Sequence, residues 1–142
     1  MLTALLAAEA RFLIVGAHAL AAHGVPRATV DIDIWIDRSA PNVRRVWKAL
    51  AAFGAPVEAL DVREDDLTRP DMVAQFGLPP HRIDLLTGVT GVTFDEAWPN
   101  RTEELLEGVV VPVISREDLI RNKTATGRDK DRVDVRALHG KS

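Results

Sequence analysis

The first apolar run of the chain predicts a buried strand that turns directly into a helix. Residues 12–15 read Phe-Leu-Ile-Val, a short and partly β-branched run, and Gly16 follows it. Such a run bounded by glycine is typical of a strand that is covered on both faces. Residues 17–23 favour helix, and Gly24 supplies the usual helix terminus. Because residues 2–10 are rich in Ala and Leu, the pattern predicts the order helix, strand, glycine turn, helix.

The next segment alternates between apolar and polar residues and predicts a second strand with an acidic face. Across residues 29–37, Val and Ile occupy one side, and the other side carries Asp31, Asp33, Trp35 and Asp37. Residues 39–53 change to a three- and four-residue period, which predicts an amphipathic helix. Trp47 and Phe53 lie on the apolar stripe of this helix, so we expect both in the core.

The rest of the chain predicts a surface connection, two strand pairs and two closing helices. Residues 57–71 have many acids and no sustained period, which indicates a surface connection with one helical turn around residues 64–67. Pro112 should place its strand at a sheet edge or near the strand end. The remaining elements are predicted at 72–77 with 82–86, 101–106 with 109–114, 115–126 and 130–138. We therefore expect an α/β (α+β) fold, a mixed and largely antiparallel sheet with flanking helices.

Composition and charge limit the classes of function. A chain of 142 residues with 46% hydrophobic positions is expected to form one domain over residues 1–142. The absence of cysteine excludes disulfides, thiolate nucleophiles and zinc–thiolate sites, and it favours a cytoplasmic location. A net charge of -3 gives no general attraction for nucleic acid or membrane, so a polyanion would need the basic cluster near the C-terminus. The longest apolar run, residues 12–22, is too short to span a bilayer and lacks the basic flank of a signal peptide.

Two carboxylates on the predicted acidic strand carry the main chemical signal. Residues two apart on a strand point the same way, with Cα atoms about 6 to 7 Å apart, so Asp31 and Asp33 face one small volume. Two anions held together repel each other unless a cation neutralises them, and Mg²⁺ prefers oxygen ligands of this kind. Asp84 lies among apolar residues on a later strand, where an unpaired charge would be costly. It is therefore the candidate third ligand of a Mg²⁺ or Mn²⁺ site.

Two other interpretations fit the same Asp-x-Asp pair. The pair could form the solvated face of an edge strand and bind nothing, because short motifs often match by chance. A phosphatase of the haloacid-dehalogenase type would use Asp31 as nucleophile and Asp33 as acid, but the chain lacks room for a cap and has its first strand in the wrong place. The turn before the acids argues against both of these interpretations. Gly16 opens a helix whose exposed N–H groups attract phosphate. The sequence therefore favours a phosphate-binding turn beside a metal site.

The order of strand, glycine turn, helix and Asp-x-Asp strand resembles the DNA polymerase beta-like nucleotidyltransferase superfamily. Gly16 corresponds to the first glycine of the family's turn. Its two metal-binding acids correspond to Asp31 and Asp33, and its third acid corresponds to Asp84. The chain departs from the family at Ala17, where Gly or Ser is usual. Three further segments resemble the small bacterial branch related to abortive-infection toxins and minimal nucleotidyltransferase antitoxins, namely residues 23–29, 120–123 and 128–131.

The resemblance implies a nucleotidyltransferase fold and a metal-dependent activity. The reaction would transfer a nucleoside monophosphate from an NTP, ATP included, to an acceptor hydroxyl. Asp31, Asp33 and Asp84 would be the catalytic, metal-binding acids, with Asp84 as general base. The acceptor stays open among an RNA end, a protein and a small molecule. The alternative is a catalytically silent module of the same fold that binds a toxin–antitoxin protein partner. The nucleotide-binding candidates are Gly16, Ala17, Thr29 and Lys123.

Two of these nucleotide-binding candidates also have purely structural interpretations. Thr29 could serve strand packing or a turn hydrogen bond. Lys123 stands among other basic residues that supply phosphate-directed charge, or it could lie on a solvated helix face and pair with Asp118 and Asp131. The basic neighbours of this lysine are Arg121, Arg128 and Lys130.

Overall fold

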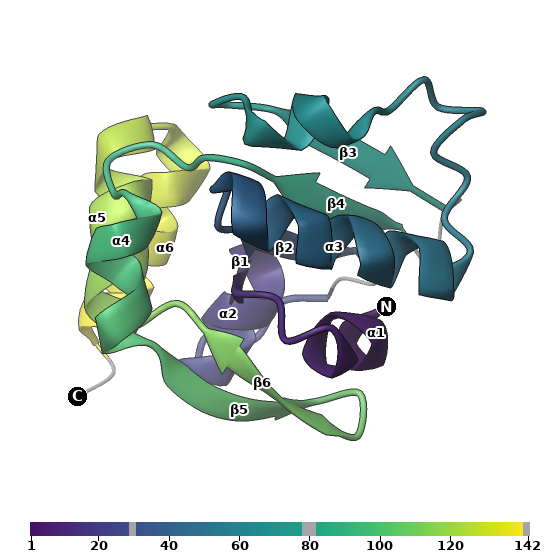
Figure 1. Cartoon of the computed structure of the whole chain (residues 1–142). Helices are drawn as coiled ribbons and strands as arrows, with labels where there is room; N and C mark the ends of the chain where they lie inside the picture. Colours follow the sequence, from purple (N-terminus) through teal and green to yellow (C-terminus); the bar gives the residue numbers. More distant parts are fainter. Residues whose placement is uncertain (29–30, 78–81, 141–142) are drawn as a thin grey trace.

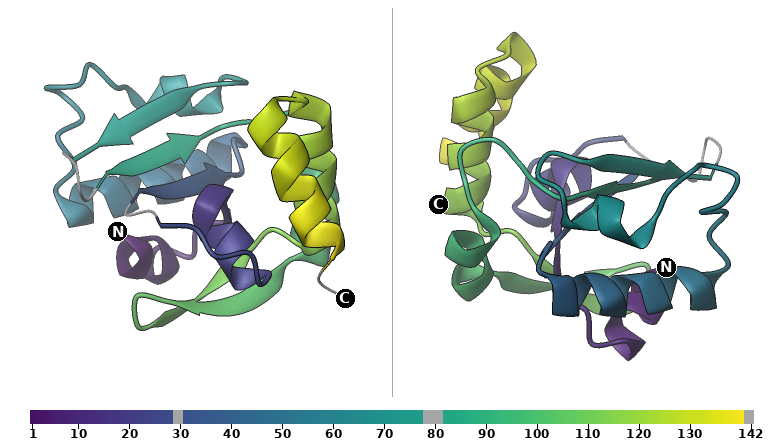
Figure 2. Two further views of the ribbon diagram at one scale, coloured as in Figure 1. Left: turned by 180° about the vertical axis from the view of Figure 1, so that it is seen from behind. Right: turned by 45° about the horizontal axis from the view of Figure 1, so that its top comes forward.

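The fold is a six-stranded sheet with helices on both sides (Figures 1 and 2). A computed structural model of the chain describes residues 1–28, 31–77 and 82–140. The strands follow the order β3-β4-β2-β1-β6-β5 across the sheet. Their bounds are β1 (Phe12–Val15), β2 (Ile32–Ile36), β3 (Val73–Phe76), β4 (Ile83–Leu86), β5 (Thr102–Leu106) and β6 (Val109–Val113).

The helices confirm most of the predicted pattern. Figure 1 shows α3 in front of the sheet, and the rear view of Figure 2 brings α2 and α6 forward. No helix within the described ranges is long and apolar enough to cross a membrane. The α-helices are α1 (Leu2–Ala7), α2 (Gly16–Ala22), α3 (Ala40–Phe53), α4 (Phe94–Ala97), α5 (Arg116–Thr126) and α6 (Asp129–His139), and two 3-10 helices are η1 (Glu64–Thr68) and η2 (Trp98–Asn100).

The sheet is mixed, and its antiparallel pairings outnumber its parallel ones, as predicted. The three antiparallel pairs are β1 with β2, β3 with β4 and β5 with β6, whereas β2–β4 and β1–β6 are parallel. The β5–β6 hairpin turns at Glu107 and Gly108, whose φ angles of 51° and 83° match the backbone of a tight two-residue hairpin turn. Pro112 lies near the end of β6, which is not an edge strand because it sits between β1 and β5.

The core contains nearly all of the two central strands, β1 and β2. All four residues of β1 are buried, and β2 is buried at every position except Asp33. Trp47 of α3 is half-buried and packs against this core, so its predicted place in the core is confirmed in part. Phe53 is not in the core, because it is the last residue of α3 and 46% of its surface is exposed. The helical period extends the apolar stripe one turn too far, since it cannot show where the underlying sheet stops.

A short helix that we did not predict, α4, contacts strand β2 through its first residue, Phe94. Thr93 caps α4: its hydroxyl accepts a hydrogen bond from the N–H of Glu96, whose carboxylate accepts one from the N–H of Thr93. This reciprocal capping pattern, Thr-x-x-Glu, is visible in the sequence. Phe94 then makes an edge contact with the buried Trp35 and stacks on Trp98. The helix is therefore held on the same face of β2 as Asp33.

Candidate active site

The structure brings the three predicted acids together. Strands β2 and β4 run parallel, and Asp33 is the direct neighbour of Asp84 in their register. Asp31 lies immediately before β2, and its side chain reaches toward the start of β4 through an ion pair with Arg82. The edge-strand interpretation of Asp31 and Asp33 is wrong, because β2 lies between β1 and β4. A central strand with acids on one face is a costly arrangement that calls for a compensating cation.

The glycine turn is pressed against the second acid of the pair. Val15, the last residue of β1, is the register partner of Asp33, so Gly16 begins α2 beside that carboxylate. Gly16 has a φ of +68°, and a Cβ at this position would overlap Oδ2 of Asp33 and lie 3.0 Å from its Cγ. Only glycine meets both demands, because it tolerates positive φ and leaves space for the carboxylate. Ala17 follows in the first turn of α2 and is half-buried.

Arg82 supplies the positive charge among these acids. Its Nη2 donates a hydrogen bond of 2.8 Å to Oδ2 of Asp31, and its Nε lies 3.5 Å from Oδ1 of Asp84. The guanidinium therefore bridges the first and third acids from the residue just before β4. Sequence reasoning did not single out Arg82. Its position two residues before Asp84, on the same side of the chain, was the available signal.

The proximity of the carboxylates changes the acidity of the central one. Burial raises the pKa of Asp33, and the charge and hydrogen bond of Asp84 and the charge of Asp31 raise it further, to about 6. The positive charge of Arg82 offsets part of this increase. Asp33 is thus protonated more readily than an ordinary aspartate, which is the expected result of burial first and of two neighbouring carboxylates second.

The acid cluster has the donor chemistry that a hard divalent cation requires. Asp31, Asp33 and Asp84 offer carboxylate oxygens, which Mg²⁺ and Mn²⁺ prefer. Oδ1 of Asp84 is buried and has no hydrogen-bond partner among the described residues. As the side chains stand, no described group of three or more His, Asp or Glu is arranged to hold a metal ion. A cation would therefore need the carboxylates to reorient and the guanidinium of Arg82 to move.

Lys123 lies in a buried ion-pair network between the last two helices. It is 8% exposed, and its Nζ lies 3.4 Å from Oδ1 of Asp131 and 3.0 Å from Oδ2 of Asp134. Asp134 also pairs with Arg27, in the loop before β2. The interpretation of Lys123 as part of a solvated helix face is wrong, because α6 covers it. The predicted pairing with Asp131 is confirmed. Asp118 pairs with Arg121 instead, and Asp134 is a further partner of Lys123 that sequence reasoning missed.

Charge and burial oppose each other in this network. Burial disfavours the ionised form of Asp131, but hydrogen bonds from Arg128 and Thr126 and the charge of Lys123 hold its pKa well below the ordinary value. Burial lowers the pKa of Lys123, and the attraction of Asp131 offsets this only in part. The network ties α5 and α6 together, and through Arg27 it also ties α6 to the segment that leads into the acidic strand.

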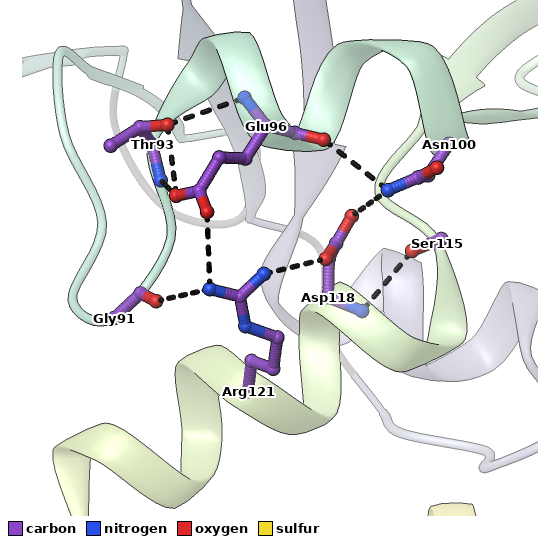
Figure 3. A network of polar contacts seen from close by, with 7 residues as sticks. All are labelled: Gly91, Thr93, Glu96, Asn100, Ser115, Asp118 and Arg121. Carbon is purple, nitrogen blue, oxygen red and sulfur yellow. Dashed lines mark hydrogen bonds and ion pairs between the residues drawn. The ribbon is translucent and has the colours of Figure 1, made fainter.

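The neighbouring Arg121 is also used within the fold. Figure 3 shows its guanidinium between α4 and α5, where it donates to the carbonyl of Gly91 and pairs with Glu96 and Asp118. Arg121 of α5 therefore joins this helix to Glu96 of α4, and Asn100 of η2 donates a further hydrogen bond to Asp118 (Figure 3). Much of the predicted phosphate-directed charge thus meets carboxylates of the protein itself. Thr29 lies outside the described residues.

Comparison with known proteins agrees with the class of fold that the site suggests. The sheet order, the glycine turn and the acids on neighbouring parallel strands define a nucleotidyltransferase-type fold. Residues 2–139 match the model of a family described as nucleotidyltransferase of unknown function (DUF6036). The chain belongs to this family.

Two solved structures share the fold at low sequence identity. One is the lincosamide antibiotic adenylyltransferase LnuA in its lincomycin-bound form, at 14% identity and a TM-score of 0.53, over 93% of this chain and 87% of that one. The other is a Thermotoga maritima protein assigned as a nucleotidyltransferase, at 15% identity and a TM-score of 0.53, over 93% of this chain and 83% of that one. No protein of curated function matches the sequence.

Proposed function

We propose that the protein is a metal-dependent nucleotidyltransferase that moves a nucleoside monophosphate from an NTP to an acceptor hydroxyl. The observation that carries this proposal is the register of β2 and β4, which sets Asp33 beside Asp84, with Asp31 immediately before β2. The Gly16 turn, in contact with Asp33, adds a backbone segment at which phosphate can approach closely.

In the proposed reaction, Asp31, Asp33 and Asp84 would hold Mg²⁺ or Mn²⁺, which would offset negative charge on the phosphates. Asp84 takes the proton from the acceptor hydroxyl. The acceptor oxygen forms a bond to the α-phosphorus of the NTP, and the bond from that phosphorus to the bridging oxygen breaks. Pyrophosphate leaves with the electron pair of the broken bond, and Asp84 later returns its proton to solvent.

We propose Gly16, Ala17, Thr29 and Lys123 as the residues that bind the nucleotide. For Gly16 and Ala17, the support is their place at the first turn of α2 beside Asp33. For Lys123, a phosphate contact requires exchange of its ion pairs with Asp131 and Asp134. If Lys123 contacts phosphate in this way, Lys123→Ala should weaken NTP binding. Lys123→Arg keeps the positive charge and should restore most of the NTP affinity.

The acceptor is proposed as a small hydroxyl compound first, with RNA ends and proteins as further classes. One fold neighbour is an adenylyltransferase of a lincosamide antibiotic, which is a small acceptor.

A second candidate function is a silent module that binds a protein partner, as antitoxins do. The observation that favours it is Ala17, which offers no hydroxyl to phosphate at the first turn of α2.

The test separates nucleotide binding from nucleotidyl transfer. Labelled NTPs with Mg²⁺ and panels of the three acceptor classes should give a labelled product with the wild type. Asp84→Asn should bind a non-hydrolysable Mg²⁺-NTP within about tenfold of wild type, yet lose transfer by about two orders of magnitude or more, the usual scale for a general base. Asp65→Asn is the matched control, because Asp65 is an exposed aspartate on η1. Nucleotide binding without transfer to any acceptor would support the silent module instead.

A further inference from the structure

The contacts of Arg82 with its two acids are unequal. The contact with Asp31 is a hydrogen bond of 2.8 Å, whereas the 3.5 Å approach of Nε to Asp84 satisfies neither atom. Both Nε of Arg82 and Oδ1 of Asp84 are buried without a hydrogen-bond partner among the described residues. Buried polar atoms left in this state are costly, and the cost disappears when a better partner takes their place.

The charge balance is also incomplete. In the described part of the chain, one guanidinium stands among three carboxylates, and Asp33, the register neighbour of Asp84, has no ion pair with it. A divalent cation brings twice the charge and bonds carboxylate oxygens directly. Arg82 is 35% exposed in its side chain, so the guanidinium can leave the cluster for solvent without crossing the core.

We propose that Arg82 is a positioning residue that holds Asp31 and Asp84 together in the metal-free protein and is exchanged for the divalent cation. The inference rests on the proposed function, because it concerns the same acids. In the metal-free state, the guanidinium limits the repulsion among the carboxylates and keeps them facing one another. When Mg²⁺ enters, the guanidinium leaves Asp31 and Asp84, so the metal binds in competition with the protein's own side chain.

Competition makes a counterintuitive prediction about metal affinity. Removal of Arg82 should tighten metal binding, because the cation no longer displaces a bound side chain. We expect Arg82→Gln to bind Mn²⁺ about tenfold more tightly than wild type, equivalent to about 1.4 kcal/mol. Arg82→Lys keeps the charge but cannot bridge two carboxylates as a planar fork does. It should therefore also bind Mn²⁺ more tightly than wild type, by about threefold.

The experiment titrates Mn²⁺ into the full chain and counts free Mn²⁺ by electron paramagnetic resonance, with the melting temperature in EDTA and in excess Mg²⁺ as a second readout. Arg82→Gln should melt below wild type in EDTA and show the larger rise with Mg²⁺. Arg44→Gln is the matched control, because Arg44 is exposed on α3. It should bind Mn²⁺ as wild type does.

The possible results separate this inference from the proposed function. Unchanged or weaker Mn²⁺ binding by Arg82→Gln, with normal binding by wild type, overturns the exchange and leaves the metal site standing. A wild-type affinity for Arg82→Lys shows that charge alone acts, and it also overturns the exchange. Absence of Mn²⁺ binding in wild type and all variants overturns both proposals. Tighter binding in both Arg82 variants and not in the control supports the exchange.

Discussion

Asp33→Asn should stabilise the metal-free protein at high pH, because the native fold holds this carboxylate against its neighbours. The pKa of Asp33 is raised from 3.8 to about 6 by burial first and by Asp84 and Asp31 second. A difference of about two pKa units corresponds to about 3 kcal/mol. The side chain keeps partial contact with water, so we halve this value for solvent screening and expect about 1.5 kcal/mol.

The sign of the pH dependence follows from proton binding. Between pH 4 and 6 the native state holds a proton on Asp33 that the unfolded chain releases, so the free energy of unfolding falls as pH rises through this window. The penalty is fully present above pH 6 and absent below pH 4. Asparagine carries no charge at any pH. The variant should therefore exceed wild type by about 1.5 kcal/mol at pH 8, equivalent to about 5 °C in melting temperature, and equal it at pH 4.

Urea unfolding in EDTA at pH 4, 6 and 8 measures this difference directly. Asp65→Asn, on the exposed side of η1, is the control and should follow wild type at every pH. Excess Mg²⁺ should reverse the order at pH 8, because bound cation stabilises wild type and Asp33→Asn lacks one of the proposed ligands. A variant that is less stable than wild type at pH 8 in EDTA, or one whose difference is the same at pH 4 and 8, would refute the reasoning.

Two further predictions concern the turn and the ion-pair network. Gly16→Ala should cost about 2 to 4 kcal/mol and weaken stabilisation by Mg²⁺, because the new Cβ meets a carboxylate at positive φ, whereas Gly54→Ala, with positive φ and open space, should cost about 1 kcal/mol and leave Mg²⁺ unaffected. Equal losses in the two variants would show that backbone strain alone acts. Asp134→Asn should cost about 3 kcal/mol in urea unfolding, because Lys123 then keeps only one of its buried partners. Asp129→Asn changes an exposed residue of the same helix and should stay within about 0.5 kcal/mol, and a similarly small loss for Asp134→Asn would contradict the role given to the network.

Local patterns predicted the elements that depend on neighbouring residues. Each of three signals depends only on residues close together in the sequence. They are the period of two over β2, the period of 3.6 over α3 and the glycine after β1. The helix predicted over residues 115–126 begins as α5 at Arg116, and the hydroxyl of Ser115 accepts a hydrogen bond from the N–H of Asp118. Thr93 and Glu96 form a capping box, which is a local sequence signal for the start of α4. These features can be predicted from the sequence because the interactions that stabilise them join residues no more than about four positions apart.

Pairing across the sheet was decided by the tertiary structure. The sequence by itself determined that Asp31 and Asp33 share one face of a strand, because alternation along a strand is fixed by backbone geometry. That Asp84 stands beside Asp33, and that Arg82 reaches Asp31, depends on a parallel register between segments about fifty residues apart. Lys123 shows the same limit, because its burial follows from how α6 packs on α5. Such contacts form only when loop closure and core packing favour one arrangement over others. A local sequence pattern therefore cannot predict which distant segments pair.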